Sequence, residues 1–114
     1  MEEFVEQTLL YDFYGELLTQ HQKKIYEDFV CNDLSLSEIA EEQGISRQGV
    51  HDLIKRSKKI LEEYEQKLHL IEKFIATKEK VEEINQLLTD YDPNQKKEII
   101  DKIKDLTDHI LEEL

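Results

Sequence analysis

Long stretches without helix-breaking residues constrain the fold of this chain more than any other feature of its sequence. Glycine occupies three of the 114 positions and proline one, and neither interrupts residues 50–92. Hydrophobic residues recur every three or four positions along most of the chain, which is the spacing of one face of an α-helix. Glu, Lys, Leu and Ile dominate the composition, and all four suit long helices. The sequence therefore predicts an all-α fold.

Capping residues divide the chain into predicted helices. The N-terminal part is predicted to hold helices over residues 4–18, 20–31 and 36–43. Helix starts are indicated by four side chains that accept hydrogen bonds from free backbone N–H groups: Thr19, Ser35, Ser46 and Asp92. Glu38 follows Ser35 by three residues, which is the capping-box pattern. Pro93 suits the first position of the last helix, which we expect to run to about residue 112.

The hydrophobic stripe from residue 46 to residue 91 fits either one long helix or two helices with a bend near residues 65–70. We favour the bend, because a helix of more than about 40 residues is rare in a globular domain. We expect two parts that pack as one unit: a helix-turn-helix part, residues 1–65, and a C-terminal helical hairpin, residues 66–114.

The segment from Leu36 to Val50 has the spacing of a helix-turn-helix unit. Ala40 is small, so that two helices can approach closely, and Gly44 permits a sharp turn between them. Ile45 is predicted to fill the gap between the helices, and Val50 to pack the second helix on the first. Because these residue types all stand at the right offsets, the segment predicts two helices joined by a tight turn.

Positive charge is concentrated beside this turn in an otherwise acidic chain. The net charge of the chain is −12, but residues 46–59 hold five bases and one acid. Residues 1–45 hold two bases and eleven acids, and residues 60–114 hold eight bases and fifteen acids. A cationic island of this kind indicates a surface for an acidic partner, such as nucleic acid.

The second helix of such a unit can place its first residues at base edges in the major groove, with basic residues further along meeting phosphates. Arg pairs well with guanine and Gln with adenine. The predicted nucleic-acid or partner-binding residues are Arg47, Gln48, His51, Lys55, Arg56, Lys58 and Lys59.

Two other interpretations of this segment stay open. The unit is also simply a stable three-helix core, and both Asp52 and the acidic remainder of the chain oppose a polyanion. The basic residues also fit a solvated helix face, in which Lys59 pairs with Glu63 one turn later.

No residue pattern indicates catalysis, a metal site or a cofactor. The four histidines lie apart, none joins Cys31 in a metal-ligand pattern, and no glycine-rich phosphate loop is present. We therefore expect a protein that is not an enzyme and has no catalytic, metal or cofactor-binding residue. No stretch approaches the ~20 apolar residues that cross a bilayer, and no basic segment followed by an apolar one opens the chain. We expect a cytoplasmic protein without membrane insertion.

Two runs of residues carry a family resemblance: Leu9–Thr19, LLYDFYGELLT, and Leu34–Arg56, LSLSEIAEEQGISRQGVHDLIKR. They resemble the YlxM family of Firmicute-type bacteria, whose helix-turn-helix is similar to region 4 of sigma-70-type factors. The resemblance covers nearly the whole chain and is loose after about residue 65. It implies an all-α fold, with a sigma-region-4-like helix-turn-helix part followed by additional long C-terminal helices.

The resemblance also implies a functional setting. Genes of this family typically lie beside the gene for Ffh, the GTPase of the signal recognition particle. The expected function is therefore a regulatory or accessory protein of the signal recognition particle pathway, with Ffh, the particle's RNA or both as partners. The alternative is a DNA-binding transcriptional regulator. The C-terminal hairpin adds a third possibility, a protein-interaction surface that docks a partner or forms a homodimer.

Overall fold

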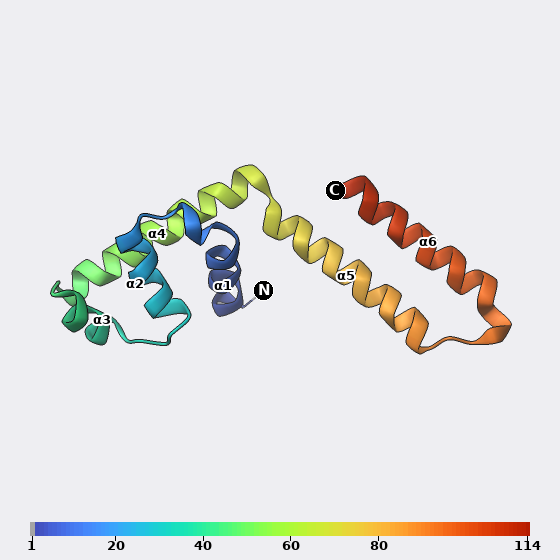
Figure 1. Cartoon of the computed structure of the whole chain (residues 1–114), viewed down its shortest axis with the longest axis horizontal. Coiled ribbons are helices and arrows are strands. Elements are labelled where there is room, and N and C mark those ends of the chain that lie inside the picture. Colours follow the sequence, from blue (N-terminus) through green and yellow to red (C-terminus); the bar gives the residue numbers. More distant parts are fainter. Residues whose placement is uncertain (1) are drawn as a thin grey trace. The chain divides into compact units, whose positions relative to one another are not determined.

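The computed structural model describes residues 2–114 as helices joined by short turns, with no β-strand in that range (Figure 1). The α-helices are α1 (Glu3–Tyr14), α2 (Gln20–Val30), α3 (Leu36–Gln43), α4 (Arg47–Leu68), α5 (Leu70–Thr89) and α6 (Lys96–Glu113). Short 3-10 helices follow α1 and precede α6, at Gly15–Leu17 and Pro93–Gln95. The predicted all-α fold is confirmed. The last α-helix begins three residues later than predicted, because the Asp92 side chain caps a 3-10 turn first.

The chain divides into two compact units, one that ends at Ile71 and one that runs from Glu72 to Leu114. This division lies six residues after the boundary predicted at residue 65. The packing of the two parts as one unit stays a prediction.

Side-chain caps fix where the helices of the first unit begin. The Thr19 hydroxyl accepts from the Gln22 backbone N–H at 3.2 Å, and the Gln22 side chain accepts from the Thr19 N–H in return. Ser35 and Glu38 make the same reciprocal pair at the start of α3, as their spacing predicts. These caps satisfy N–H groups that the first turn of a helix leaves without a partner.

The core of the first unit forms where α1, α2 and α3 pack against α4. Its buried hydrophobic residues come from every helix of the unit and from the turns between them: Leu10, Tyr14, Leu18, Ile25, Tyr26, Val30, Ile39, Val50, Ile54, Leu61 and Ile71. The rings of Tyr11 and Tyr26 stack with their centroids 6.1 Å apart. Burial of this many large side chains supplies the main driving force for folding of the unit.

A hydrogen-bonded junction sets the end of α4 and the start of α5. His69 adopts the left-handed conformation, with φ of 56°, and thereby ends α4. Tyr14 Oη donates to Glu65 Oε1 at 2.5 Å and accepts from the Leu70 N–H at 3.2 Å. Glu65 Oε1 also accepts from the Ile71 N–H at 2.9 Å. The first N–H groups of α5 are thus bound by side chains of α1 and α4, and the bend predicted near residues 65–70 is confirmed.

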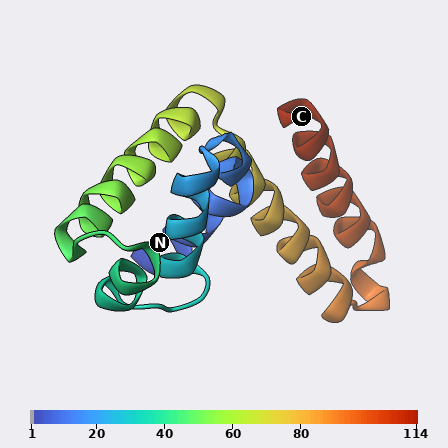
Figure 2. The same ribbon diagram turned by 60° about the vertical axis from the view of Figure 1, so that its left-hand side comes forward.

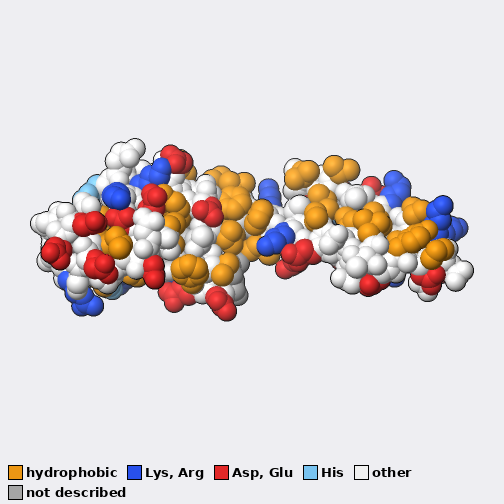
Figure 3. All heavy atoms as spheres, turned by 60° about the horizontal axis from the view of Figure 1, so that its bottom comes forward, with side chains coloured by type: hydrophobic (Ala, Val, Ile, Leu, Met, Phe, Trp, Pro, Cys, Tyr) orange, Lys and Arg blue, Asp and Glu red, His pale blue; other side chains and the backbone are white. Residues whose placement is uncertain are grey.

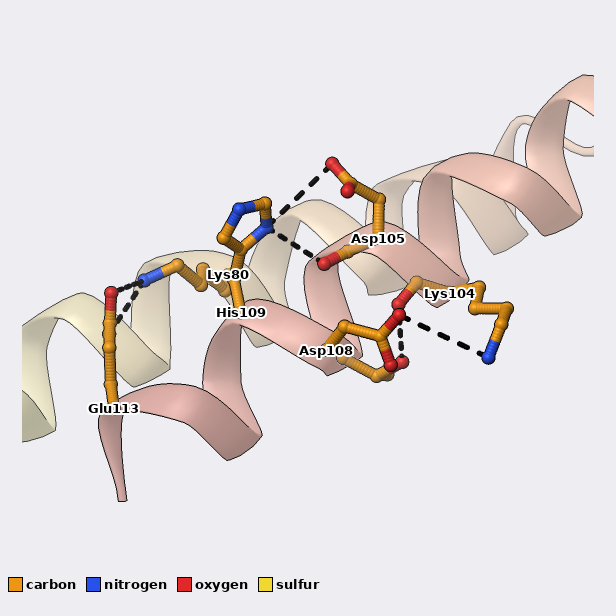
Figure 4. A network of polar contacts seen from close by, with 7 residues as sticks. Lys80, Lys104, Asp105, Asp108, His109 and Glu113 are labelled. Atoms are coloured by element: carbon orange, nitrogen blue, oxygen red, sulfur yellow. Dashed lines mark hydrogen bonds and ion pairs between the residues drawn. The ribbon is translucent and has the colours of Figure 1, made fainter.

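The second unit is an antiparallel pair made from most of α5 and from α6. The Lys80 ammonium on α5 lies 2.8 and 2.9 Å from the two carboxylate oxygens of Glu113 on α6 (Figure 4). The other polar contacts drawn there stay within α6: His109 Nδ1 lies 2.8 Å from the Asp105 carbonyl oxygen, and Lys104 pairs with Asp108 at 4.0 Å. Ile99 is the only buried hydrophobic residue among the described residues from 72 to 114.

Candidate functional site

The turn between α3 and α4 forms the predicted helix-turn-helix (Figure 2, green segments). Gly44 ends α3 in the left-handed conformation, with φ of 67° and ψ of 31°, where a Cβ would strain the backbone. The Ile45 N–H returns to the Ala40 carbonyl at 3.2 Å. The Ser46 hydroxyl then accepts from the Gly49 N–H at 2.9 Å and starts α4. Three residues, Gly44, Ile45 and Ser46, therefore suffice to turn the chain from one helix into the next.

Packing across this turn fixes which side of α4 faces outward. Ile39 on α3 and Val50 on α4 are fully buried, and Ile54 lies one turn further along the same buried stripe. Ile45 is 37% exposed, so its side chain fills less of the gap between the helices than predicted. Because a helix has 3.6 residues per turn, the side opposite Val50 and Ile54 must face outward.

Six of the seven predicted binding residues have exposed side chains on α4: Arg47, Gln48, His51, Lys55, Arg56 and Lys59. The seventh, Lys58, lies toward the packed side of the helix. Its ammonium is 3.6 Å from Glu3 Oε1 on α1, and only 27% of its side chain is exposed. The structure thus separates Lys58 from the other six residues, and their role in binding stays a prediction.

Four cationic side chains are exposed on α4 and are called the cationic face here: Lys55, Arg56 and Lys59 lie away from Val50 and Ile54, whereas Arg47 lies in the first turn, on the same side of the helix as Ile54. Within residues 2–114, none of these four side chains forms an ion pair with a carboxylate. The first and the last of them are twelve residues apart, or about 18 Å along the helix axis. Glu62 and Glu63 follow on the exposed side of α4, so the cationic face ends at Lys59. Its charges are therefore available to an acidic partner.

Asp52 lies in the middle of this surface and ties two neighbouring side chains to itself. Gln48 Nε2 donates to Asp52 Oδ1 at 3.0 Å, and His51 Nδ1 lies 3.5 Å from the same oxygen. The Arg56 Nε donates to the Asp52 carbonyl oxygen at 3.4 Å. The hydrogen bond between Gln48 and Asp52 was not predicted, although their four-residue spacing on a helix is a signal for it. A base that binds Gln48 must replace this internal hydrogen bond.

Within residues 2–114, no three His, Cys, Asp or Glu side chains are grouped so that they could hold a metal ion. The same residues include no helix that is long and apolar enough to span a membrane. The exposed surface of α4 presents four cationic side chains, the amide of Gln48 and the imidazole of His51.

The family model described as "UPF0122: Putative helix-turn-helix protein, YlxM / p13 like" matches residues 1–106. The chain belongs to this YlxM / p13-like family. A UPF0122 protein of Desulforamulus reducens is 41% identical over 112 residues, which are 98% of this chain and 96% of that protein.

Two further relatives in this family show a similar degree of identity. A UPF0122 protein of Bacillus mycoides is 41% identical over 93% of this chain and 98% of its own length. A UPF0122 protein of Caldanaerobacter subterraneus is 48% identical over 76% of this chain and 74% of its own length. The predicted family membership is therefore confirmed, and the helix-turn-helix that defines the YlxM / p13-like family by name is the unit formed by α3 and α4.

Proposed function

We propose that this protein is a regulatory or accessory protein of the signal recognition particle pathway and binds the particle's RNA through the cationic face of α4. The proposal describes a protein that acts by binding, without a cofactor and without catalysis, in the cytoplasm. The pathway comes from the family resemblance, whereas the mode of binding comes from the surface of α4.

One observation carries the proposal. Four cationic side chains stand exposed on one helix and form no ion pair with any residue from 2 to 114, in a chain whose net charge is −12. None of the four side chains packs in the core, so the fold does not need them for core packing. The phosphate groups of a nucleic acid have the opposite charge to these side chains. When the cations neutralise the phosphates, counterions are released from the nucleic acid, which favours binding. Basic Ffh surfaces would instead meet the acidic remainder of the chain, and Ffh is therefore the second partner to test.

Binding of the particle's RNA tests the proposal directly. Titration of the purified RNA, with and without Ffh, is expected to show saturable binding that weakens as salt rises. If about four phosphates are contacted, the logarithm of the affinity should fall by roughly three to four units per tenfold rise in salt.

The chain offers a matched control for charge. The triple variant Arg47→Glu, Lys55→Glu, Lys59→Glu should lose binding at all salt concentrations. The triple variant Lys96→Glu, Lys97→Glu, Lys102→Glu changes the net charge by the same amount at exposed positions of the second unit. This control variant should retain RNA binding if the charges on α4, rather than the net charge of the chain, determine the affinity. Equal loss in both variants, or no RNA binding at low salt, would refute the proposal.

Asp52 gives a gain-of-function test of the same surface. Replacing Asp52 with Asn removes a negative charge from the middle of the cationic face and keeps a side chain that can hydrogen-bond to Gln48. RNA affinity should rise several-fold at low salt and by less at high salt, because screening weakens the removed repulsion.

Duplex DNA is the second candidate ligand, because Arg47 and Gln48 are exposed in the first turn of the second helix of the unit. In helix-turn-helix proteins this turn contacts base edges. A DNA-binding regulator predicts that Gln48→Ala changes sequence preference and that a preferred duplex outcompetes the RNA. Preference for the RNA over every duplex in a random pool would exclude this candidate.

A further inference from the structure

His51 lies on α4 between two side chains of the cationic face. Arg47 precedes it by four residues and Lys55 follows it by four, so that each is one turn, or about 6 Å, away along the helix axis. The imidazole is 54% exposed, and its Nδ1 lies 3.5 Å from Asp52 Oδ1. Histidine is the residue type that ordinarily changes charge between pH 5 and 8. A proton on His51 therefore adds a positive charge inside the proposed binding surface.

The helices packed against α4 form no ion pair with His51. Within residues 2–114, Asp52 supplies the one carboxylate that lies within 4.0 Å of a nitrogen of this imidazole. From α1, Glu3 reaches α4 at Lys58, seven residues after His51. The charged groups of α2 and α3 form other contacts: on α2, Lys24 pairs with Asp28, and on α3, Glu38, Glu41 and Glu42 line a hollow together with Leu34.

The acidic surroundings keep a constant charge while a histidine titrates. Figure 3 shows Asp and Glu side chains spread over the visible face of the first unit. Carboxyl side chains ordinarily titrate near pH 4, and lysine and arginine above pH 10. Between pH 8 and 6 the side chains that change charge are therefore the histidines: His21, His51, His69 and His109. Of these, His51 is the one that lies within α4.

We propose that protonation of His51 strengthens RNA binding by the cationic face, so that this site binds RNA more tightly at pH 6 than at pH 8. The inference rests on the proposed function, because it concerns regulation of the same surface. Two effects have the same sign. The imidazolium adds a charge between Arg47 and Lys55, which favours phosphate. Its Nδ1–H also donates a charge-assisted hydrogen bond to Asp52 and offsets the carboxylate that repels phosphate.

Asp52 thereby has a second role on this surface. An opposite charge favours the protonated form of an imidazole, and like charges disfavour it. Arg47 and Lys55 act against the proton on His51, whereas Asp52 acts in its favour. The carboxylate that opposes RNA at high pH is thus the group that promotes the charged state of His51 at low pH.

RNA titration of the full-length chain at pH 8 and pH 6, at constant ionic strength, tests the inference. The affinity of the wild type should be about two- to fivefold higher at pH 6, which is the size of one exposed ion pair. His51→Gln should remove most of this increase. His51→Lys should remove the pH dependence as well, but with the higher affinity at both pH values, because lysine stays charged throughout this range.

His109 provides the matched control. Its side chain is 53% exposed and its Nδ1 lies 3.7 Å from Asp105 Oδ2, but it lies on α6, in the second unit. His109→Gln should leave the pH dependence of RNA binding intact. An equal loss in both variants, or an increase at pH 6 that persists in His51→Gln, would overturn the inference and leave the proposed function standing. Absence of RNA binding at both pH values would refute the proposed function and this inference together.

NMR titration of the His51 ring protons, assigned by comparison with His51→Gln, gives a readout that does not depend on affinity. In the free protein, the midpoint of the titration should be lower in Asp52→Asn than in the wild type, because Arg47 and Lys55 then act without an opposing charge. Added RNA should raise the wild-type midpoint, since coupling between proton and RNA binding is reciprocal. A midpoint that saturating RNA leaves unchanged would contradict the inference.

Discussion

The two units of this chain are built from the same kind of amphipathic helix but hold together by different means. Among residues 2–114, the first unit buries eleven hydrophobic side chains from α1 to the start of α5, whereas the second buries one, Ile99. Three helices pack against α4 in the first, and each helix of the second has a single neighbour within the hairpin. Helical periodicity therefore predicts which residues form a face, while the number of neighbouring helices decides how well that face is buried.

Separating the two units should give the largest effect. A chain that ends at Thr77 keeps every buried residue of the first unit and the hydrogen bonds at Leu70 and Ile71. It should unfold cooperatively in urea. A peptide of residues 72–114 should lose most of its helicity in dilute solution, because isolated helices with little tertiary packing are marginal in water. Circular dichroism at matched concentration measures the helicity of both fragments. A peptide of residues 72–114 whose helicity is high and independent of concentration would contradict this difference between the units.

Truncation of one buried side chain should reproduce this contrast on a smaller scale. Ile39→Ala removes a fully buried side chain and should lower the free energy of unfolding by about 2–5 kcal/mol. Ile100→Ala, at a half-exposed position of α6, should cost less than about 1 kcal/mol. Urea denaturation with α-helical signal as the readout compares the two. Equal losses would mean that the second unit is as well packed as the first.

Tyr14 should link the stability of the first unit to alkaline pH. Burial and the hydrogen bond to Glu65 raise the pKa of Tyr14 to about 12 from its ordinary value of 10. The unfolded chain therefore loses this proton before the folded one does, so that the stability contributed by Tyr14 is full below pH 10 and decreases between pH 10 and 12. Burial raises the pKa of Tyr26 as well, in the same direction.

Replacing Tyr14 with Phe isolates this contribution. The variant loses the hydrogen bonds to Glu65 and to the Leu70 N–H, which should cost about 1–3 kcal/mol at neutral pH. Its stability should fall less steeply between pH 10 and 12 than that of the wild type. A slope identical to the wild type would mean that another tyrosine dominates the alkaline transition.

Removal of the ion pair between the helices of the hairpin should give the smallest effect. Lys80→Ala deletes the contact with Glu113 and should change the free energy of unfolding by about 0.2–1 kcal/mol, because the carboxylate is solvent-exposed and the pair is screened by salt. The difference in the free energy of unfolding between the wild type and the Lys80→Ala variant should be smaller in high salt than in low salt. A loss of several kcal/mol would reveal that this pair, rather than apolar contact, holds the hairpin.

Local sequence determined much of what was predicted. Hydroxyl side chains at residues 19, 35 and 46 cap helices because each bonds to the backbone N–H group only three residues away. Gly44 takes the left-handed conformation for an equally local reason, the absence of a Cβ. The helix-turn-helix and the outward position of Lys55, Arg56 and Lys59 follow from this local geometry together with the 3.6-residue period.

Only the tertiary structure decided the features that depend on residues far apart in the chain. Lys58 has the same charge as its neighbours, yet it pairs with Glu3, 55 positions earlier, because α1 packs against α4. The end of α4 depends likewise on Tyr14, which binds Glu65 and Leu70 across more than fifty residues. Periodicity along one helix contains no information about which other helix will cover it, and so the contacts between helices, unlike the helices themselves, had to be observed.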